Sequence, residues 1–572
     1  MKKLFIAVMA LATIVSCSKE NEEANVTPVG SETALLSVSL KAVGTRAYDY
    51  AQGNTDENAV KSIDFYLFDA EGKAYPAAES SNKVSVASGA LGNWTDGSGN
   101  IDQTSEIYLV IAKKQDTPPA QIVAVINSAT DYANKTLSQL QAEVVALSTD
   151  NGFVMTNSVY EGDNGVVVAT PIFTENIFTT SEPKGQPGTV YPAAGETKDT
   201  NVVPVEIYVE RVAAKVQVSA GTNVLNKDKF IPVKNDNGED MANTFVKVLG
   251  WQVTNATTSS YLLKKYGEGN FFTALNDKAA FRSHWAETYD QTVQHNLTFN
   301  AITGEDALNL GSYNYYLENT LSSENTDGWF NDVKTNTHAD ATKAAQLIVA
   351  AQLVDANGSP KEFGIWYGKQ YDQLEDTEEG GKPVYGLKSL MINNAAKQIF
   401  VKDTKNSTDA VTVYKGISAG DVTFYQVDDQ TSYKATGWNG DLRYEVKVKA
   451  KEGVQYYSAE KDANGNPIAL EADAVNAILE KIEPAMMWKS GYTYYSTLIN
   501  HYKVGETQLN GLVRNHVYDI KITSVNGYGT PVYDPTKIIT PEIPVDQKGF
   551  SLTAQINVLS WAVVSQDVNL GN

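Results

Sequence analysis

The feature that most constrains the fold is an alternation of apolar and polar residues that recurs in short runs along the chain. In the run at residues 34–43, Leu36, Val38 and Leu40 fall on one face and mostly polar residues fall on the other. A period of two residues is typical of a β-strand with one buried face. Further strand-like runs lie between segments rich in Asn, Asp and Gly, at residues 60–75, 105–114, 120–129, 203–221, 244–255, 344–358, 443–453, 513–529 and 551–570. The pattern predicts a chain that folds mainly into β-sheets joined by turns.

Helical spacing of apolar residues is much rarer than strand alternation. Residues 135–148 place three leucines and a valine at helical intervals and predict a helix, and residues 471–482 predict a second, short one. Many strands, few helices and polar loops predict a mainly β fold of two antiparallel β-sandwich domains, of transthyretin-like or Greek-key type, with few short helices. The chain length favours more than one domain, and no repeat of fixed period indicates a solenoid or propeller.

The first residues have the form of an export signal. Two lysines precede an apolar run at residues 4–15 that is too short to span a bilayer. The run ends in the sequence IVSC at Cys17, the only cysteine of the chain, and resembles a bacterial lipobox. In such a signal the cysteine is cut free at its amino end and acylated; an ordinary secretory signal with a chance cysteine is the alternative. With Cys17 acylated, the exported protein has no thiol for disulfides, nucleophilic catalysis or metal binding.

The charge balance limits the partners of the exported protein. The formal net charge of −22 disfavours nucleic acid and anionic membrane surfaces as partners. The acidic tether SKENEE at residues 18–23 resembles signals that send lipoproteins to the outer cell surface. We therefore expect contact with the outer membrane only through the lipid of the precursor.

The sequence contains no arrangement typical of an enzyme. None of the five histidines forms an HExxH motif, and the chain has no GxSxG elbow, P-loop or dinucleotide fingerprint. The acidic runs at residues 235–240 and 462–467 could hold calcium through oxygen ligands, but such runs are usually turns. We predict a protein that is not an enzyme, with no cofactor, no metal ligands and no catalytic residues.

The C-terminal end carries an apolar strand behind a proline-containing linker at residues 534–547. The apolar phase of this strand changes between Val558 and Leu559, as a bulge or strand break would require. The strand must bury one face, either on its own domain or on another partner. The candidates for burial are Ile556, Val558, Leu559, Trp561 and Val563.

Several motifs, taken in order, resemble the major fimbrillins of type V pili, specifically the Mfa-type major subunit of short fimbriae. The most specific is RNHVY at residues 514–518, which a glycine-bearing turn follows. The others are the lipobox, GTRA at 44–47, IDFYLFDAEGK at 63–73, YVERVAAKV at 208–216, GWQVTNATTSSYLLKK at 250–265, YYLENT at 315–320 and INVLSWAVVSQDVNL at 556–570. Their order and spacing make the set specific.

The resemblance implies a lipoprotein precursor that carries palmitate on Cys17 and a trypsin-like, arginine-directed protease that cuts between Arg46 and Ala47. The removable strand, with Leu36, Val38 and Leu40, would then leave a groove in the N-terminal domain. The C-terminal donor strand of an identical subunit would enter this groove by β-strand addition. Because the contact does not close on itself, the product is a filament, a homopolymer of identical subunits.

The same resemblance implies a domain organisation and further partners. We expect a signal peptide at 1–16, a propeptide with the removable strand at 17–46, an N-terminal β-sandwich at 47–208, a C-terminal β-sandwich with polar insertions at 209–547 and a donor segment at 548–572. The insertions at 265–340 and 365–440 do not map onto the family. Accessory tip and anchor fimbrillins are the further partners, and the location is a fimbrium at the cell surface that supports adhesion and biofilm formation.

Two alternatives to a stalk subunit stay open at this point. One is a tip or anchor subunit of the same pilus, but a tip would lack a donor strand and an anchor would keep its leader strand uncut. The other is a surface glycan-binding β-sandwich lipoprotein, which needs exposed aromatic platforms. The candidate platforms are Trp251, Trp285, Trp329, Trp366 and Trp488.

Overall fold

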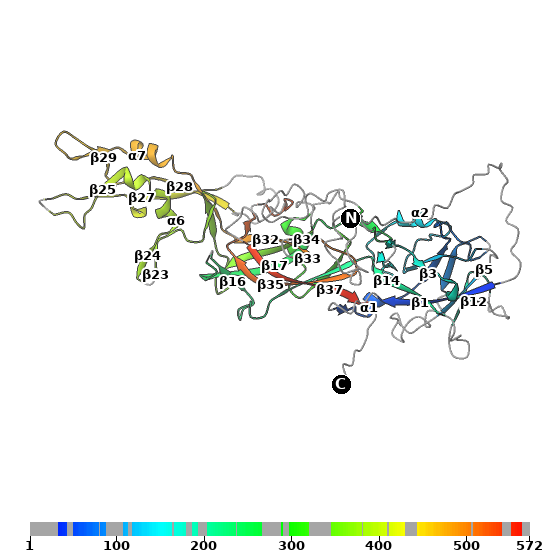
Figure 1. Cartoon of the computed structure of the whole chain (residues 1–572). Helices are drawn as coiled ribbons and strands as arrows, with labels where there is room; N and C mark the ends of the chain where they lie inside the picture. The colour runs from blue at the N-terminus through cyan, green and yellow to red at the C-terminus, as the bar shows by residue number, and fades with distance from the viewer. Residues whose placement is uncertain are drawn as a thin grey trace, which may run out of the picture.

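The structure is a computed structural model that describes residues 33–42, 50–78, 80–86, 107–112, 117–162, 165–178, 186–192, 203–235, 237–265, 288–289, 297–319, 345–379, 381–408, 411–428, 443–504, 507–532, 534–539 and 551–562. Three β-rich bodies follow one another along an elongated molecule, with the N-terminal strands at one end and a lobe carrying β25, β29 and α7 at the other (Figure 1). The prediction of a mainly β fold with few short helices is confirmed. Among the described residues, no helix is long and apolar enough to cross a membrane.

The first body is built on a sheet with the strand order β13-β5-β1-β14-β8-β6-β3-β4. Its strands are β1 (Thr33–Ala42), β3 (Ile63–Phe68), β4 (Lys83–Val86), β5 (Ile107–Ala112), β6 (Gln121–Ile126), β8 (Met155–Asn157), β13 (Thr189–Pro192) and β14 (Val205–Arg211), with β11 (Thr170–Pro171) and β12 (Ile177–Phe178) attached. One face carries a core around Phe65, Leu109 and Ile207, and the other carries a cluster around Tyr66 and Val123. Burial on both faces explains why β5 and β6 are apolar almost throughout.

The helix predicted over residues 135–148 is largely wrong. A capping box between Thr136 and Gln139 starts α2 (Leu137–Gln141), which ends after five residues. The chain then forms β7 (Val144–Ala146), which pairs with β18 (Ser259–Tyr261) of the second body. The β-branched valines favour a strand, and pairing with a distant segment decides the conformation.

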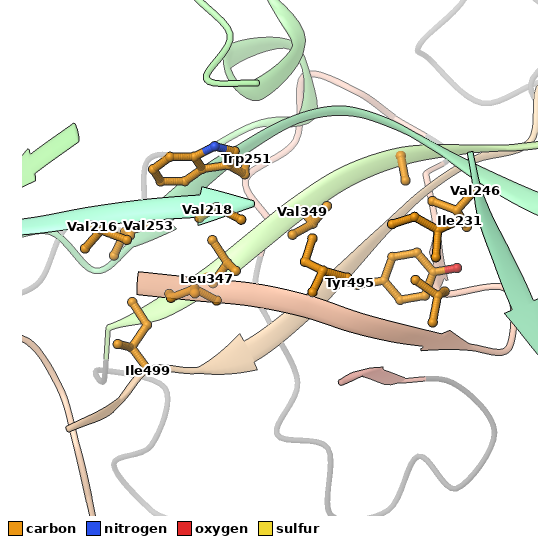
Figure 2. Packing of buried hydrophobic residues seen from close by; sticks show 14 of the residues in the cluster. Val216, Val218, Ile231, Val246, Trp251, Val253, Leu347, Val349, Tyr495 and Ile499 are labelled. Carbon is orange, nitrogen blue, oxygen red and sulfur yellow. The ribbon is translucent and has the colours of Figure 1, made fainter. Parts of the chain in front are cut away.

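The second body is built on a sheet with the order β19-β15-β35-β16-β17-β20-β32-β36. Its strands are β15 (Ala214–Ala220), β16 (Ile231–Lys234), β17 (Asp240–Thr254), β19 (Tyr313–Tyr316), β20 (Gln346–Val354), β32 (Tyr492–Leu498), β35 (His516–Asn526) and β36 (Thr530–Pro531), with β2 (Tyr50–Gln52) and β37 (Ser551–Ala562) attached. Figure 2 shows part of its core, where Trp251 packs in one cluster with Leu347 and Ile499. The Trp251 indole N–H donates to the Asn309 carbonyl at 2.9 Å, so the largest core side chain is also satisfied as a donor.

A third body is inserted between β20 and β32, in a region that the sequence analysis treated mainly as a polar insertion. One sheet holds β21 (Phe363–Trp366), β22 (Lys369–Tyr371), β27 (Val422–Asp428), β28 (Arg443–Ala450) and β31 (Ala485–Trp488), and another holds β25 (Ile399–Lys402), β26 (Tyr414–Gly416), β29 (Tyr456–Lys461) and β30 (Pro467–Leu470). Helix α6 (Leu387–Ile392) and helix α7 (Ala472–Leu479), the latter predicted, supply apolar residues to its two small cores. The third body therefore has apolar cores of its own.

The remaining elements are short and most are local. They are the hairpins β9–β10 (Tyr160–Gly162, Gly165–Val167), β23–β24 (Thr377–Glu379, Lys382–Val384) and β33–β34 (Asn500–Val504, Thr507–Asn510), the helices α1 (Thr55–Asn58) and α4 (Phe299–Thr303), and the 3-10 turns η2 (Thr174–Asn176), η7 (Ala395–Lys397) and η8 (Ala419–Asp421). Most strand pairs are antiparallel, and β1–β14, β15–β35, β16–β35 and β2–β37 are parallel. The domain boundary expected between residues 208 and 209 falls within β14, and the first sheet passes into the second at residues 212–213.

Candidate strand-exchange site and domain junction

Strand β1 is an inner strand of the first sheet. It pairs antiparallel with β5, where Leu36 lies opposite Leu109, and parallel with β14, where Leu40 lies opposite Ile207. Among the described strands, only β1 joins the β13-β5 edge to the rest of this sheet along the hydrogen-bonded order. Loss of β1 would therefore split the sheet and open two strand edges that face each other.

The core beneath β1 is apolar and buried. Val38 is fully buried in the same cluster as Ile107, Leu109, Val205 and Ile207, of which none is more than 3% exposed. Burial of one valine-sized or leucine-sized side chain stabilises a fold by about 1.5–3 kcal/mol. Removal of β1 would expose this apolar surface together with unpaired backbone groups, a state that is costly unless another strand fills the gap.

Strand β37 lies in the sheet of its own second body. It runs antiparallel to β35, with Ile556 opposite Ile520, Val558 opposite Tyr518 and Leu559 opposite Val517. The break expected between Val558 and Leu559 is wrong, because the register is regular there and shifts instead between Ile522 and Ser524 of β35.

The end of β37 meets the start of the first body. Trp561 lies opposite Ala51 of β2, in a short parallel pair. Figure 1 shows β37 pointing toward α1 and β1 at the boundary between the first two bodies. Cys17, Arg46, Ala47 and Val563 lie outside the described residues. The structure thus brings the end of the predicted donor strand close in space to the segment that follows the predicted cleavage site.

The boundary between the two bodies is a buried polar junction, which the sequence analysis missed. Its first ion pair joins Arg514 and Glu318 at 2.7 Å, with both side chains almost fully buried. The Arg514 guanidinium also donates to the carbonyls of Tyr261 and Leu262, and the Ser260 hydroxyl donates to the same Glu318 carboxylate. Arg514 thus ties the turn before β35 to the end of β18.

A second buried pair lies beside the first. Lys264 Nζ lies 3.1 Å from Glu210 Oε2, and neither side chain is exposed. Burial raises the pKa of Glu210 to about 7 and lowers the pKa of Lys264, because both charged forms lose hydration. The Ser158 hydroxyl donates to the same carboxylate oxygen at 3.3 Å, so the pair links β14 and the loop after β8 to the segment after β18.

A third group of contacts fixes α1 onto the junction. Arg211 Nε donates to the Glu57 carbonyl at 2.9 Å, and Arg211 Nη2 donates to Asn58 Oδ1. The Glu57 carboxylate accepts from Lys215 Nζ at 2.7 Å and from the Tyr315 hydroxyl at 2.6 Å. Burial would raise the pKa of Glu57, but these hydrogen bonds outweigh it and lower the pKa.

The motifs behind the fimbrillin resemblance converge on this junction. Glu210 and Arg211 come from YVERVAAKV, Lys264 from the end of YLLKK, Glu318 from YYLENT and Arg514 from RNHVY. In each case a charged residue interrupts or ends an otherwise apolar run. That local signal could have identified them as buried charges, because charges on a solvent face normally alternate with the apolar positions.

Histidines 501 and 516 lie beside this junction, with ring centroids 5.0 Å apart. His516 is buried and its Nδ1 lies 2.8 Å from the Arg514 carbonyl. Burial lowers the pKa of His516 to about 4 from an ordinary value of 6.5. In the unfolded chain the imidazole takes up a proton near pH 6.5, whereas the folded chain does so only near pH 4.

This difference predicts a pH dependence that His516→Gln removes. Because the unfolded state binds more protons, His516 lowers stability progressively as the pH falls from about 6.5 to about 4, approaching a factor of ~10 per pH unit in the unfolding constant. Glu210, whose pKa is raised to about 7, acts in the opposite direction between about pH 4.5 and 7. We therefore compare the urea midpoint of wild type with that of His516→Gln at each pH. The difference between the two midpoints should shrink as the pH falls from about 6.5 to about 4. A constant difference would contradict the assignment.

The two acidic runs that could hold calcium form turns in the structure. Among the described residues, no group of three His, Cys, Asp or Glu side chains is arranged to hold a metal ion. In the acidic run at 462–467, Asp462 Oδ1 accepts from the backbone N–H groups of Asn464 and Asn466 and closes the β29–β30 hairpin. In the run at 235–240, Asn235 does the same for Asn237 and Glu239. Both runs therefore form turns.

The tryptophans offered as glycan platforms are mostly unavailable for that role. Trp251 and Trp488 are core residues, the latter stacked on Phe363 at 5.7 Å, so their candidacy as platforms is wrong. Trp366 is half-buried and its indole N–H donates to the Glu483 carbonyl at 2.9 Å. Trp285 and Trp329 lie outside the described residues.

The fold and the junction together define an extended, mainly β protein whose C-terminal strand completes its second sheet. Residues 486–567, which include RNHVY and β37, match the family described as fimbrillin C-terminal, major fimbrial subunit protein type IV. This match supports the resemblance to fimbrillins within residues 486–567. A comparison with curated proteins gives no match.

Solved structures of three proteins are similar to the chain. A fimbrilin (FimA) from Porphyromonas gingivalis W83 is 14% identical over 93% of this chain and 98% of its own, with a TM-score of 0.34. The tip fimbrial protein Mfa3 from Porphyromonas gingivalis, with C-terminal truncation, is 10% identical over 92% and 100%, with a TM-score of 0.30. A fimbrial assembly protein from Parabacteroides distasonis is 13% identical over 75% and 100%, with a TM-score of 0.25.

Proposed function

We propose that the chain is the major, stalk-forming subunit of a cell-surface fimbria and that it polymerises when β1 is exchanged for the C-terminal strand of a second copy. The observation that carries this proposal is the inner position of β1 between β5 and β14, over a core that contains the fully buried Val38. A leader strand in this position cannot be removed without a replacement, whereas an edge strand could simply be lost.

The resemblance to fimbrillins implies an order of events, and the inner position of β1 is consistent with it. The precursor is exported as a lipoprotein held at the outer membrane through Cys17, and an arginine-directed, trypsin-like protease cuts after Arg46. While β1 is attached to its own chain, it competes for the groove at the high effective concentration of an intramolecular partner. After the cut it becomes a separate peptide, and the segment from Ile556 to Val563 of another subunit can take its place. The role is structural and non-enzymatic, in adhesion, with tip and anchor fimbrillins as further partners.

Limited trypsin digestion of the purified precursor, followed by electron microscopy, tests the proposal. We expect a product that begins at Ala47 and filaments that appear after the cut. Arg46→Ala should block both, and Arg443→Ala, which removes an arginine from the third body, should block neither. A wild-type chain that is cut at Arg46, loses the strand and stays monomeric at high concentration would contradict the polymer model.

A further inference from the structure

We infer that β2 is a latch that holds the C-terminal strand on its own chain until the precursor is cut. This inference rests on the proposed function and adds a mechanism that controls when the donor strand becomes available. Its basis is the parallel pair between Tyr50–Gln52 and the last three residues of β37, Ser560–Ala562. The segment that follows the cleavage site is thereby bound directly to the strand that must leave.

In the uncut chain, β2 is held at both ends. On its N-terminal side, the chain is continuous with β1, which ends at Ala42 and is clamped between β5 and β14. Only residues 43–49 separate β1 from β2, a stretch that spans at most about 25 Å when fully extended. A segment tethered at both ends loses little further conformational entropy when it pairs.

On its C-terminal side, β2 is fixed by the junction. Gly53 follows it directly, and its carbonyl accepts from Asn58 Nδ2 at 2.9 Å. A Cβ at Gly53 would overlap with Asn58 Oδ1 and lie 2.8 Å from Arg211 Nη2. Only glycine therefore lets the backbone pass this close to the junction. The Arg211 contacts to Glu57 and Asn58 then anchor α1, which starts two residues later.

Cleavage after Arg46 removes the first tether and leaves the second. The new N-terminus begins three residues before β2, so β2 becomes a chain end held only at Gly53. Terminal segments that are held at one side open readily. The end of β37 then loses its partner first, and the strand can separate from β35 progressively from Ala562 toward Ser551. Proteolysis thus prepares the groove and the donor strand in one step.

Hydrogen exchange of the backbone amides in residues 551–562, measured on monomers by mass spectrometry, tests the latch. The reference is the uncut full-length precursor, and the first comparison is the cut protein before filaments form. The second is uncut Arg46→Ala that also carries Tyr50→Gly, Ala51→Pro and Gln52→Gly, which removes the β2 ladder without a cut. The matched control is Arg46→Ala with Thr377→Gly, Glu378→Pro and Glu379→Gly, the same changes in β23 of the third body.

We expect exchange in residues 551–562 to rise at least about fivefold in the cut protein and in the β2 variant, the factor for one net backbone hydrogen bond. The β23 control should match the reference, and the amides within residues 517–522 of β35 that donate to β15 should stay protected wherever the second body is folded. Unchanged exchange in both the cut protein and the β2 variant would overturn the latch. Filaments without faster exchange contradict the latch alone, whereas faster exchange in a cut chain that never polymerises contradicts the proposed polymer.

Discussion

Deletion of residues 551–572 is expected to abolish filaments completely while the cut after Arg46 proceeds at the wild-type rate. The variant keeps β1, β5 and β14, so its groove forms and opens, but it has no strand to offer to a neighbour. Electron microscopy and N-terminal sequencing of the digested protein measure the two outcomes separately. Filaments of normal length from the pure deletion variant would contradict the assignment of β37 as the donor.

The deletion also removes β37 from β35, where Tyr518, Ile520 and Ile522 are fully buried. A failure to fold could therefore imitate a failure to polymerise. Mixing distinguishes the two, because a folded, cut deletion variant still accepts a strand but passes none on. Added in small amounts to cut wild type, it should cap growing filaments and shorten them in proportion to its fraction. A misfolded variant would leave the filament length unchanged.

The proposed strand exchange requires the vacated groove to bind β37 more favourably than its own sheet does. In its own body, β37 pairs along its length with β35 alone and meets β2 only at its end. In a vacated groove, an incoming strand meets β5 on one side and β14 on the other, over the core around Leu109 and Ile207. The second strand ladder, which β37 lacks along most of its length in its own body, would favour exchange once β1 is gone.

Local alternation was sufficient to locate the strands that matter for function. The runs around Leu36, Phe65 and Ile520 all contain strands, because one buried face imposes a period of two on the sequence. The limits agree best around Leu36, where the strand covers residues 33–42. The helix over residues 135–148 failed because Val144 and Val145 pair with β18, more than a hundred residues away. No local pattern reports a contact of that sequence separation.

The assembly of the third body and the pairing of the junction charges lay beyond local reasoning for related reasons. The apolar residues of the third body are spread over short strands and helices, with Leu387, Tyr444 and Met487 in one core and Ile399 and Val475 in another. Only the strand at 443–453 and the helix at 471–482 stood out from the sequence, and the other runs are too short to be distinguished from polar loops. The junction is assembled from four distant motifs, so a sequence shows its charges singly and never as pairs.

Arg211→Met should destabilise the chain by about 2–6 kcal/mol, because it leaves two buried acceptors without a donor at about 1–3 kcal/mol each. Arg211 is fully buried, and burial lowers its pKa to about 9, which leaves it charged at neutral pH. Without the guanidinium, the Glu57 carbonyl and Asn58 Oδ1 lose their donor inside the junction. Lys234→Met provides the control, because its partner Asp240 is 62% exposed and such pairs contribute less than about 1 kcal/mol.

Urea denaturation of the uncut precursor, monitored by the near-ultraviolet circular dichroism of its aromatic residues, measures the free energy of unfolding of both variants. Arg211→Lys is informative as a third variant, because lysine keeps the charge but lacks the planar fork that reaches the Glu57 carbonyl and Asn58 together. We expect it to recover less than half of the loss. If Arg211→Met unfolds at the same urea concentration as Lys234→Met, the junction does not hold the first two bodies together. That result would also contradict the role of the Arg211 contacts in anchoring the C-terminal side of β2, on which the latch depends.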